Sequence, residues 1–235
     1  MRKSILLLLL LSLPVLCFSD AGLIGEEGQT PSGSCSSTTD NIFDEGFEGA
    51  GYENTWSENG SGTINEDYSR PGAQSPTALC SQVLYVDTDS SNETYATLNE
   101  GTARSEVYVR FYYYPGTQAA STYPYILDAG DSNGVYNLGF RVQLYSGASP
   151  SVRARGATDS STASVNAGAW NLIEIHFVRN DASWIKINGG SELSFTASDY
   201  DVQYYFLGHT GLAPTPTLTS YYDLFAINTV AIGGE

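Results

Sequence analysis

Apolar and polar residues alternate with a period of two through much of this chain of 235 residues. Three runs show the pattern most clearly, at 106–114, 137–144 and 172–178. Successive side chains of a β-strand point to opposite faces, so this alternation is typical of strands with one buried face. No stretch shows a convincing period near about 3.6, the period of a helix. The pattern therefore predicts an all-β chain.

Turn-forming residues separate these runs. Pro115-Gly116 ends the first run, and Asn180-Asp181-Ala182 joins the third run to 184–187 as a predicted hairpin. Further strands are predicted at 83–86, 123–128, 152–155, 204–207 and 221–228. Many short strands at this spacing, without helices, favour one two-sheet antiparallel jelly-roll sandwich.

The N-terminal segment has the order of a secretory signal. Arg2 and Lys3 precede an apolar run at 5–16, and small residues then offer cleavage points around residue 19. The run is too short to span a membrane. We therefore expect residues 1–19 to be a signal peptide, 20–41 a flexible polar leader rich in Gly, Ser, Thr and acidic residues, and 42–235 one domain. The predicted location is secreted, either periplasmic or extracellular.

Cysteine number and net charge limit the partners and the chemistry. Cys35 and Cys80 remain after removal of the signal, and an even pair in an oxidising compartment predicts one disulfide. The formal net charge is -16, which opposes binding to nucleic acid and to anionic membranes. We expect neither nucleic acid as a partner nor membrane insertion after processing.

Three segments together resemble the laminin-G-like members of the concanavalin A-like lectin/glucanase superfamily. They are the opening at 42–49 with Trp56 after it, the stretch at 168–177 with the hairpin at 184–189, and the closing strand at 221–227 followed by Ile232-Gly233. The resemblance implies a jelly roll of two curved antiparallel sheets with a concave face. Members include lectin-like binders, adhesion modules, glycoside hydrolases and polysaccharide lyases, so the fold alone does not fix the function.

Acidic residues near the two ends of the domain suggest a metal site. In the resembled fold the terminal strands lie close together, so Asp44, Glu48 and Asp223 would share a structural calcium ion. Calcium binds six to eight oxygens, and backbone carbonyls and water would complete the shell. The alternative is that these carboxylates are solvated or cap turns.

Tyrosine is abundant, with 17 residues. Tyr108, Arg110 and Tyr112 share one face of a predicted strand, and Arg141 and Gln143 share the polar face of another. If these faces were neighbours on the concave sheet, they would form a saccharide-binding platform, because sugar rings stack on aromatic rings and their hydroxyls bind polar side chains. Two alternatives remain: tyrosines that fill half-buried strand positions, and a protein-contact patch.

The sequence offers little support for catalysis. The E-x-D-x-x-E run of the superfamily's glycosidases is absent, and two histidines cannot form a Cys/His metal cluster. Arg104-Ser105-Glu106 and Glu174-Ile175-His176 resemble alginate lyase motifs, so a uronate lyase would use Arg104 and His176. The function favoured is an exported, non-catalytic module that binds a polysaccharide or a glycan-bearing surface. The alternatives are a uronate lyase and a purely structural adhesion component.

Overall fold

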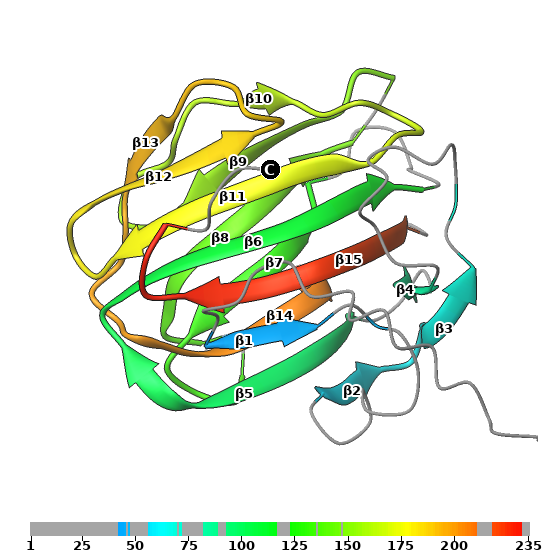
Figure 1. The fold of residues 1–235 in the computed structure, drawn as a ribbon, viewed down its shortest axis with the longest axis horizontal. Helices are drawn as coiled ribbons and strands as arrows, with labels where there is room; N and C mark the ends of the chain where they lie inside the picture. Colours follow the sequence, from blue (N-terminus) through cyan, green and yellow to red (C-terminus); the bar gives the residue numbers. More distant parts are fainter. Residues whose placement is uncertain are drawn as a thin grey trace, which may run out of the picture. The chain divides into compact units, whose positions relative to one another are not determined.

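Fifteen β-strands make up the regular secondary structure that is described in this chain (Figure 1). The structure is a computed structural model that describes residues 42–45, 47, 56–69, 71, 82–88, 93–116, 123–134, 136–146, 148–210 and 218–231. All of them belong to one compact unit, Ser34–Glu235. No helix long and apolar enough to span a membrane occurs among these residues. The predicted signal peptide and polar leader lie outside them.

The strands form two antiparallel sheets, which confirms the predicted all-β, two-sheet sandwich. Sheet A has eight strands, and β1 (Phe43–Glu45) pairs with β15 beside the main path. The path of sheet A runs in the order β13 (Leu193–Thr196), β12 (Ala182–Ile187), β11 (Asn171–Val178), β6 (Glu106–Pro115), β15 (Leu218–Asn228), β4 (Gln82–Thr88) and β3 (Thr63–Ser69).

Sheet B lies behind sheet A in the view of Figure 1. Its seven strands run in the order β10 (Ala163–Ser164), β9 (Ser151–Arg155), β8 (Leu138–Tyr145), β7 (Tyr125–Gly130), β14 (Val202–Thr210), β5 (Thr94–Arg104) and β2 (Trp56–Gly60). Residues 104 to 106 are the crossing point between the sheets, because β5 belongs to sheet B and β6 to sheet A.

The core fills the space between the two sheets. Strand β11 alternates strictly between buried and half-buried residues, as the period of two predicts. Odd-numbered residues of β6 and β11 face inward, and even-numbered residues face outward. Large side chains dominate the interior, among them Phe111, Phe140, Phe177, Tyr222 and Phe225. Each buried aromatic side chain stabilises the sandwich by roughly 1.5–3 kcal/mol relative to exposure.

Aromatic contacts join the first strands of the domain to the last. The Trp56 ring lies 5.5 Å from the Phe225 ring and 5.9 Å from the Phe43 ring, both measured between ring centroids and both edge-to-face. The register places Asp44 of β1 opposite Ala226 of β15. The opening and closing segments of the domain are therefore neighbours in sheet A.

Candidate functional site

Strand register places polar and aromatic side chains in rows across the outer face of sheet A. In the first row, His176 of β11 lies between Trp184 of β12 and Tyr108 of β6. In the next row, Glu174 lies between Lys186 and Arg110 in the same way. Side chains directly opposite one another on neighbouring strands are close enough to interact. The rows therefore bring together residues that are far apart in the sequence.

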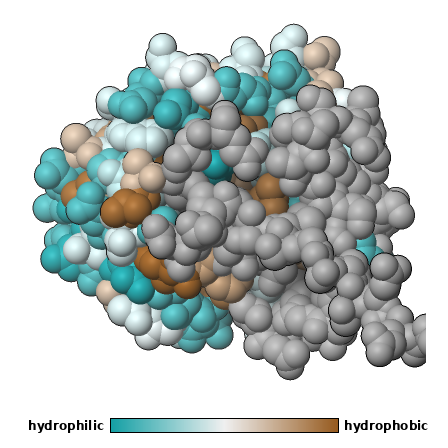
Figure 2. Space-filling model, in the orientation of Figure 1, coloured by the Kyte–Doolittle hydropathy of each residue, from teal (hydrophilic) through white to brown (hydrophobic). Residues whose placement is uncertain are grey.

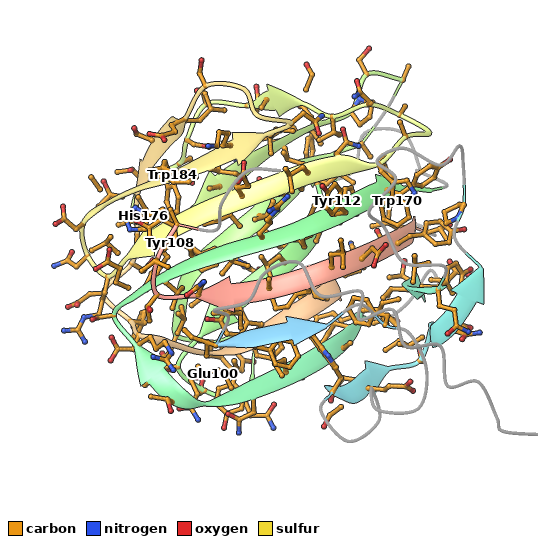
Figure 3. All side chains as sticks on the ribbon, viewed as in Figure 1. Glu100, Tyr108, Tyr112, Trp170, His176 and Trp184 are labelled. Atoms are coloured by element: carbon orange, nitrogen blue, oxygen red, sulfur yellow. The ribbon has the colours of Figure 1, made fainter. Side chains whose placement is uncertain are left out.

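The first row is an aromatic cluster. The rings of Tyr108 and His176 are stacked, with centroids 4.2 Å apart and planes 9° apart. The Trp184 ring lies 5.7 Å from His176 and 6.3 Å from Tyr108, centroid to centroid. Figure 3 shows the three side chains together on one side of the sheet. All three are half-buried, so part of their surface faces solvent.

His176 also contacts a carboxylate. Its Nε2 lies 2.9 Å from Oε1 of Glu106, whose side chain is largely exposed. This contact and the stacked Tyr108 ring together fix the plane of the imidazole. His176 therefore packs against both Tyr108 and Trp184, with one ring nitrogen in contact with Glu106.

The second row carries alternating charges. Lys186 Nζ lies 3.7 Å from Glu174 Oε2 and 5.1 Å from the centroid of the Trp184 ring. Arg110 is only 3% exposed and lies at the base of this face. A pocket of about 160 Å³ opens here, and its lining includes Tyr108, Arg110, Glu174, Trp184, Lys186 and Glu192. We call it the sheet A pocket.

The lining of the sheet A pocket combines apolar ring surface with both signs of charge. Two cations and two carboxylates balance, so the pocket carries no strong net charge. Arg110 and Lys186 can donate hydrogen bonds, while Glu174 and Glu192 can accept them. A ligand in this pocket would therefore meet both ring surface and hydrogen-bonding groups. In Figure 2, the coloured part of this face is mostly hydrophilic, with separate hydrophobic residues.

The predicted platform of five residues does not form, because its members lie on two different sheets. Tyr108, Arg110 and Tyr112 are on β6 of sheet A, whereas Arg141 and Gln143 are on β8 of sheet B. Both sets face outward, so they lie on opposite faces of the sandwich. The alternation was interpreted correctly, but it does not tell which strands share a sheet.

Two of the five predicted residues have side chains that make other contacts. Tyr112 is 6% exposed and belongs to a buried cluster with Val83, Trp170 and Leu224. Gln143 donates from Nε2 to the backbone oxygen of Tyr123 and accepts from Arg153 through Oε1. Of the five, Tyr108 and Arg110 line the sheet A pocket, and Arg141 lines a second pocket on the opposite face.

The residue pair of the lyase hypothesis is also separated. Arg104 is the last residue of β5 in sheet B, where it lies opposite Val202, while His176 is on the outer face of sheet A. Two hydrogen bonds, of 2.6 and 3.2 Å, join the Arg104 guanidinium to Glu100. Figure 3 shows Glu100 at a distance from Tyr108 and His176. Arg104 and His176 therefore belong to strands of different sheets, and neither is among the residues that line the sheet A pocket.

The predicted calcium and disulfide sites remain predictions. Asp223 is completely buried, and one of its carboxylate oxygens accepts a hydrogen bond from the Leu224 amide. The side chain of Asp44 and the whole of Glu48, Cys35 and Cys80 lie outside the described residues. Among the residues that are described, no group of three or more His, Cys, Asp or Glu could hold a metal ion.

Sequence reasoning missed Trp184 and Lys186 as site residues. Both were assigned to a hairpin, and their alternation with Ile185 and Ile187 already indicates that they face outward. The missing information was the register, which places Trp184 opposite His176. Glu192 precedes β13 and carries no sequence signal that distinguishes it from other acidic loop residues.

No family model matches this chain, so the laminin-G-like resemblance stays a prediction. No curated protein matches it in sequence.

Solved structures resemble this chain to different degrees. Cellulose-induced protein Cip1 superimposes with a TM-score of 0.60 at 15% identity, over 82% of this chain and 100% of Cip1. The binding domain of botulinum neurotoxin serotype D/C superimposes with a TM-score of 0.50 at 10% identity. The match covers 75% of this chain and 44% of the toxin chain. Alginate lyase Aly36B, solved with an alginate tetrasaccharide, has a TM-score of 0.44 at 12% identity. The match covers 65% of this chain and 82% of the lyase chain. The chain is thus a two-sheet antiparallel β-sandwich similar in fold to Cip1.

Proposed function

We propose that this protein is an exported, non-catalytic module that binds a saccharide in the sheet A pocket. The observation that carries the proposal is the lining of that pocket, where the Tyr108 and Trp184 rings adjoin Arg110, Lys186, Glu174 and Glu192. Aromatic rings offer a surface for the C–H face of a sugar. The four charged groups offer donors and acceptors for its hydroxyls.

The charge balance favours a neutral saccharide over an acidic one. Glu174 and Glu192 would repel the carboxylate of a uronate, and the lining has no excess of cations to offset this repulsion. A neutral sugar ring has hydroxyls that both donate and accept, so both signs of charge can serve it. The pocket therefore suits a neutral glycan better than a uronate.

The location of Arg104 and His176 on different sheets favours a binding function over a lyase function. A uronate lyase must neutralise the sugar carboxylate beside the base that removes the neighbouring proton. Arg104 belongs to the other sheet and is paired with Glu100, which supports binding rather than lyase chemistry. Binding requires only the aromatic surface and the polar groups that are present.

Removing Trp184 tests this proposal. The purified protein is passed over immobilised neutral and uronate-rich polysaccharides, with calcium and then with chelator. We expect retention on a neutral polysaccharide, and we expect Trp184→Ala or Tyr108→Ala to weaken binding about tenfold or more, as aromatic residues central to an interface do. Trp184 is half-buried on an outer face, so its truncation should leave the core intact.

The matched control is Tyr200→Ala, which removes an exposed ring that does not line the pocket. Its retention should equal that of the unchanged protein. No retention on any glycan would overturn the proposal and favour a structural adhesion role. Retention that Trp184→Ala leaves unchanged would show that the saccharide binds elsewhere.

A further inference from the structure

A second, larger pocket lies on the outer face of sheet B, on the opposite side of the sandwich. Its volume is about 440 Å³, and its lining includes Tyr125, Tyr136, Asn137, Arg141 and Arg155. The lining contains two arginines and no acidic residue. Both arginines are paired with carboxylates outside the lining, so guanidinium donors, rather than unbalanced positive charge, distinguish this pocket.

Strand register places the two arginines side by side. Arg141 of β8 is directly opposite Arg155 of β9, and like charges in such a position destabilise a sheet unless something compensates them. Asp128 pairs with Arg141 through two bonds of 2.7 Å, and Asp159 accepts from Arg155 Nε at 3.1 Å. Each guanidinium is therefore held firmly by a carboxylate outside the pocket lining.

A tyrosine ring orders the two guanidinium groups further. Arg141 stacks on the Tyr125 ring at 3.4 Å from its centroid, and Arg155 Nη1 donates to the hydroxyl of the same tyrosine at 2.8 Å. Neither Nη1 of Arg141 nor Nη2 of Arg155 has a hydrogen-bond partner among the described residues. Each of these two lining arginines thus keeps one Nη group without a partner there, and guanidinium donors suit the two oxygens of a carboxylate.

We propose that the sheet B pocket binds the carboxylate of an acidic saccharide between Arg141 and Arg155. Tyr136 supports a sugar as the carrier of that carboxylate, because its ring is 77% exposed on the pocket wall. An exposed aromatic beside an anion site can receive the apolar face of the ring that bears the carboxylate. This site differs from the sheet A pocket in position, charge and ligand class.

Isothermal titration with an oligomer of galacturonic acid tests the proposal, with a neutral galactose oligomer of equal length and a polyglutamate peptide as comparisons. We expect the acidic oligosaccharide to bind and the neutral one not to bind at this site. Arg155→Gln should weaken its binding about tenfold, since hydrogen bonds to charged groups contribute strongly. Tyr136→Ala should weaken it several-fold.

The controls separate this site from the sheet A pocket. Arg179→Gln removes an arginine that is paired with Asp199 and Asp201 outside both pockets, so binding should not change. Trp184→Ala should also leave binding of the acidic oligosaccharide unchanged. If Trp184→Ala left the binding of every neutral glycan unchanged, the proposed function would be overturned, but the inference about the sheet B pocket would not.

Three results would overturn the inference about the sheet B pocket. The first is that the acidic oligosaccharide does not bind, and the second is that Arg155→Gln and Arg179→Gln weaken its binding equally. The third is that polyglutamate binds as tightly as the acidic oligosaccharide, which would assign the pocket to acidic peptides. Arg155 is a surface residue, so Arg155→Gln is expected to fold, and an unchanged melting temperature confirms it.

Discussion

Arg141→Leu is expected to lower the free energy of unfolding by about 3 kcal/mol at neutral pH. The reason is Asp128, which is completely buried and is joined to Arg141 by a bidentate ion pair with both bonds at 2.7 Å. Thr210 donates a further hydrogen bond to Asp128. Without the guanidinium, Asp128 keeps one hydroxyl donor and an otherwise uncompensated buried charge. Urea unfolding followed by circular dichroism measures the loss.

A second substitution tests whether the unpaired charge is the cause. Adding Asp128→Asn to Arg141→Leu removes the buried charge, so the double variant should be more stable than Arg141→Leu alone. The control Arg179→Ala breaks only exposed ion pairs and should change stability by less than about 1 kcal/mol. Equal losses in Arg141→Leu and Arg179→Ala would refute this account of the Asp128–Arg141 pair.

Acid is expected to destabilise the protein by about 3 kcal/mol through His209 alone. His209 on β14 is 2% exposed, and burial lowers its pKa from 6.5 to about 4. Between these values the unfolded chain binds a proton that the folded chain does not. The stabilisation by neutral His209 is therefore complete above about pH 6.5 and is lost as the pH falls through 6.5 toward 4.

The matching variant is His209→Gln, which cannot titrate in this range. In each protein the free energy of unfolding is measured at about pH 7 and at about pH 4. The loss of stability between these two pH values should be about 3 kcal/mol smaller in the variant than in the unchanged protein. Carboxylates also titrate toward pH 4, but they do so in both proteins and cancel in the comparison. Identical pH dependence of the two proteins would show that folding does not lower the pKa of His209, contrary to this prediction.

Much of the fold could be predicted from the sequence because alternation is a local signal. In β11, the buried residues Ile173, Ile175 and Phe177 are the ones that the pattern assigns to the core. The hairpin between β11 and β12 could be predicted for the same reason, since it depends on one short turn. On β6 and β11 the outward-facing residues were therefore predicted correctly, whereas near the register shift at the start of β8 Leu138 lines the outer pocket and Gly139 faces the core.

The site could be predicted only in part because it depends on pairing between distant strands. Nothing local in the sequence says that β6 pairs with β11 and that β8 lies in the other sheet. Tyr108 and Arg110 were chosen for their strand face and do line the sheet A pocket. Tyr112 has the same face and the same residue type, but its neighbours Trp170 and Leu224 bury it. Burial on an outer face is a tertiary property that alternation does not report.

Tryptophan fluorescence during a saccharide titration tests the central claim most directly. The chain has three tryptophans, of which Trp56 and Trp170 are buried and Trp184 lines the sheet A pocket. A neutral oligosaccharide identified by retention should change the emission in a saturable way, and Trp184→Phe should remove that change while the protein stays folded. Saturable binding with no change in the emission of Trp184 would contradict the assignment of the saccharide site to the sheet A pocket.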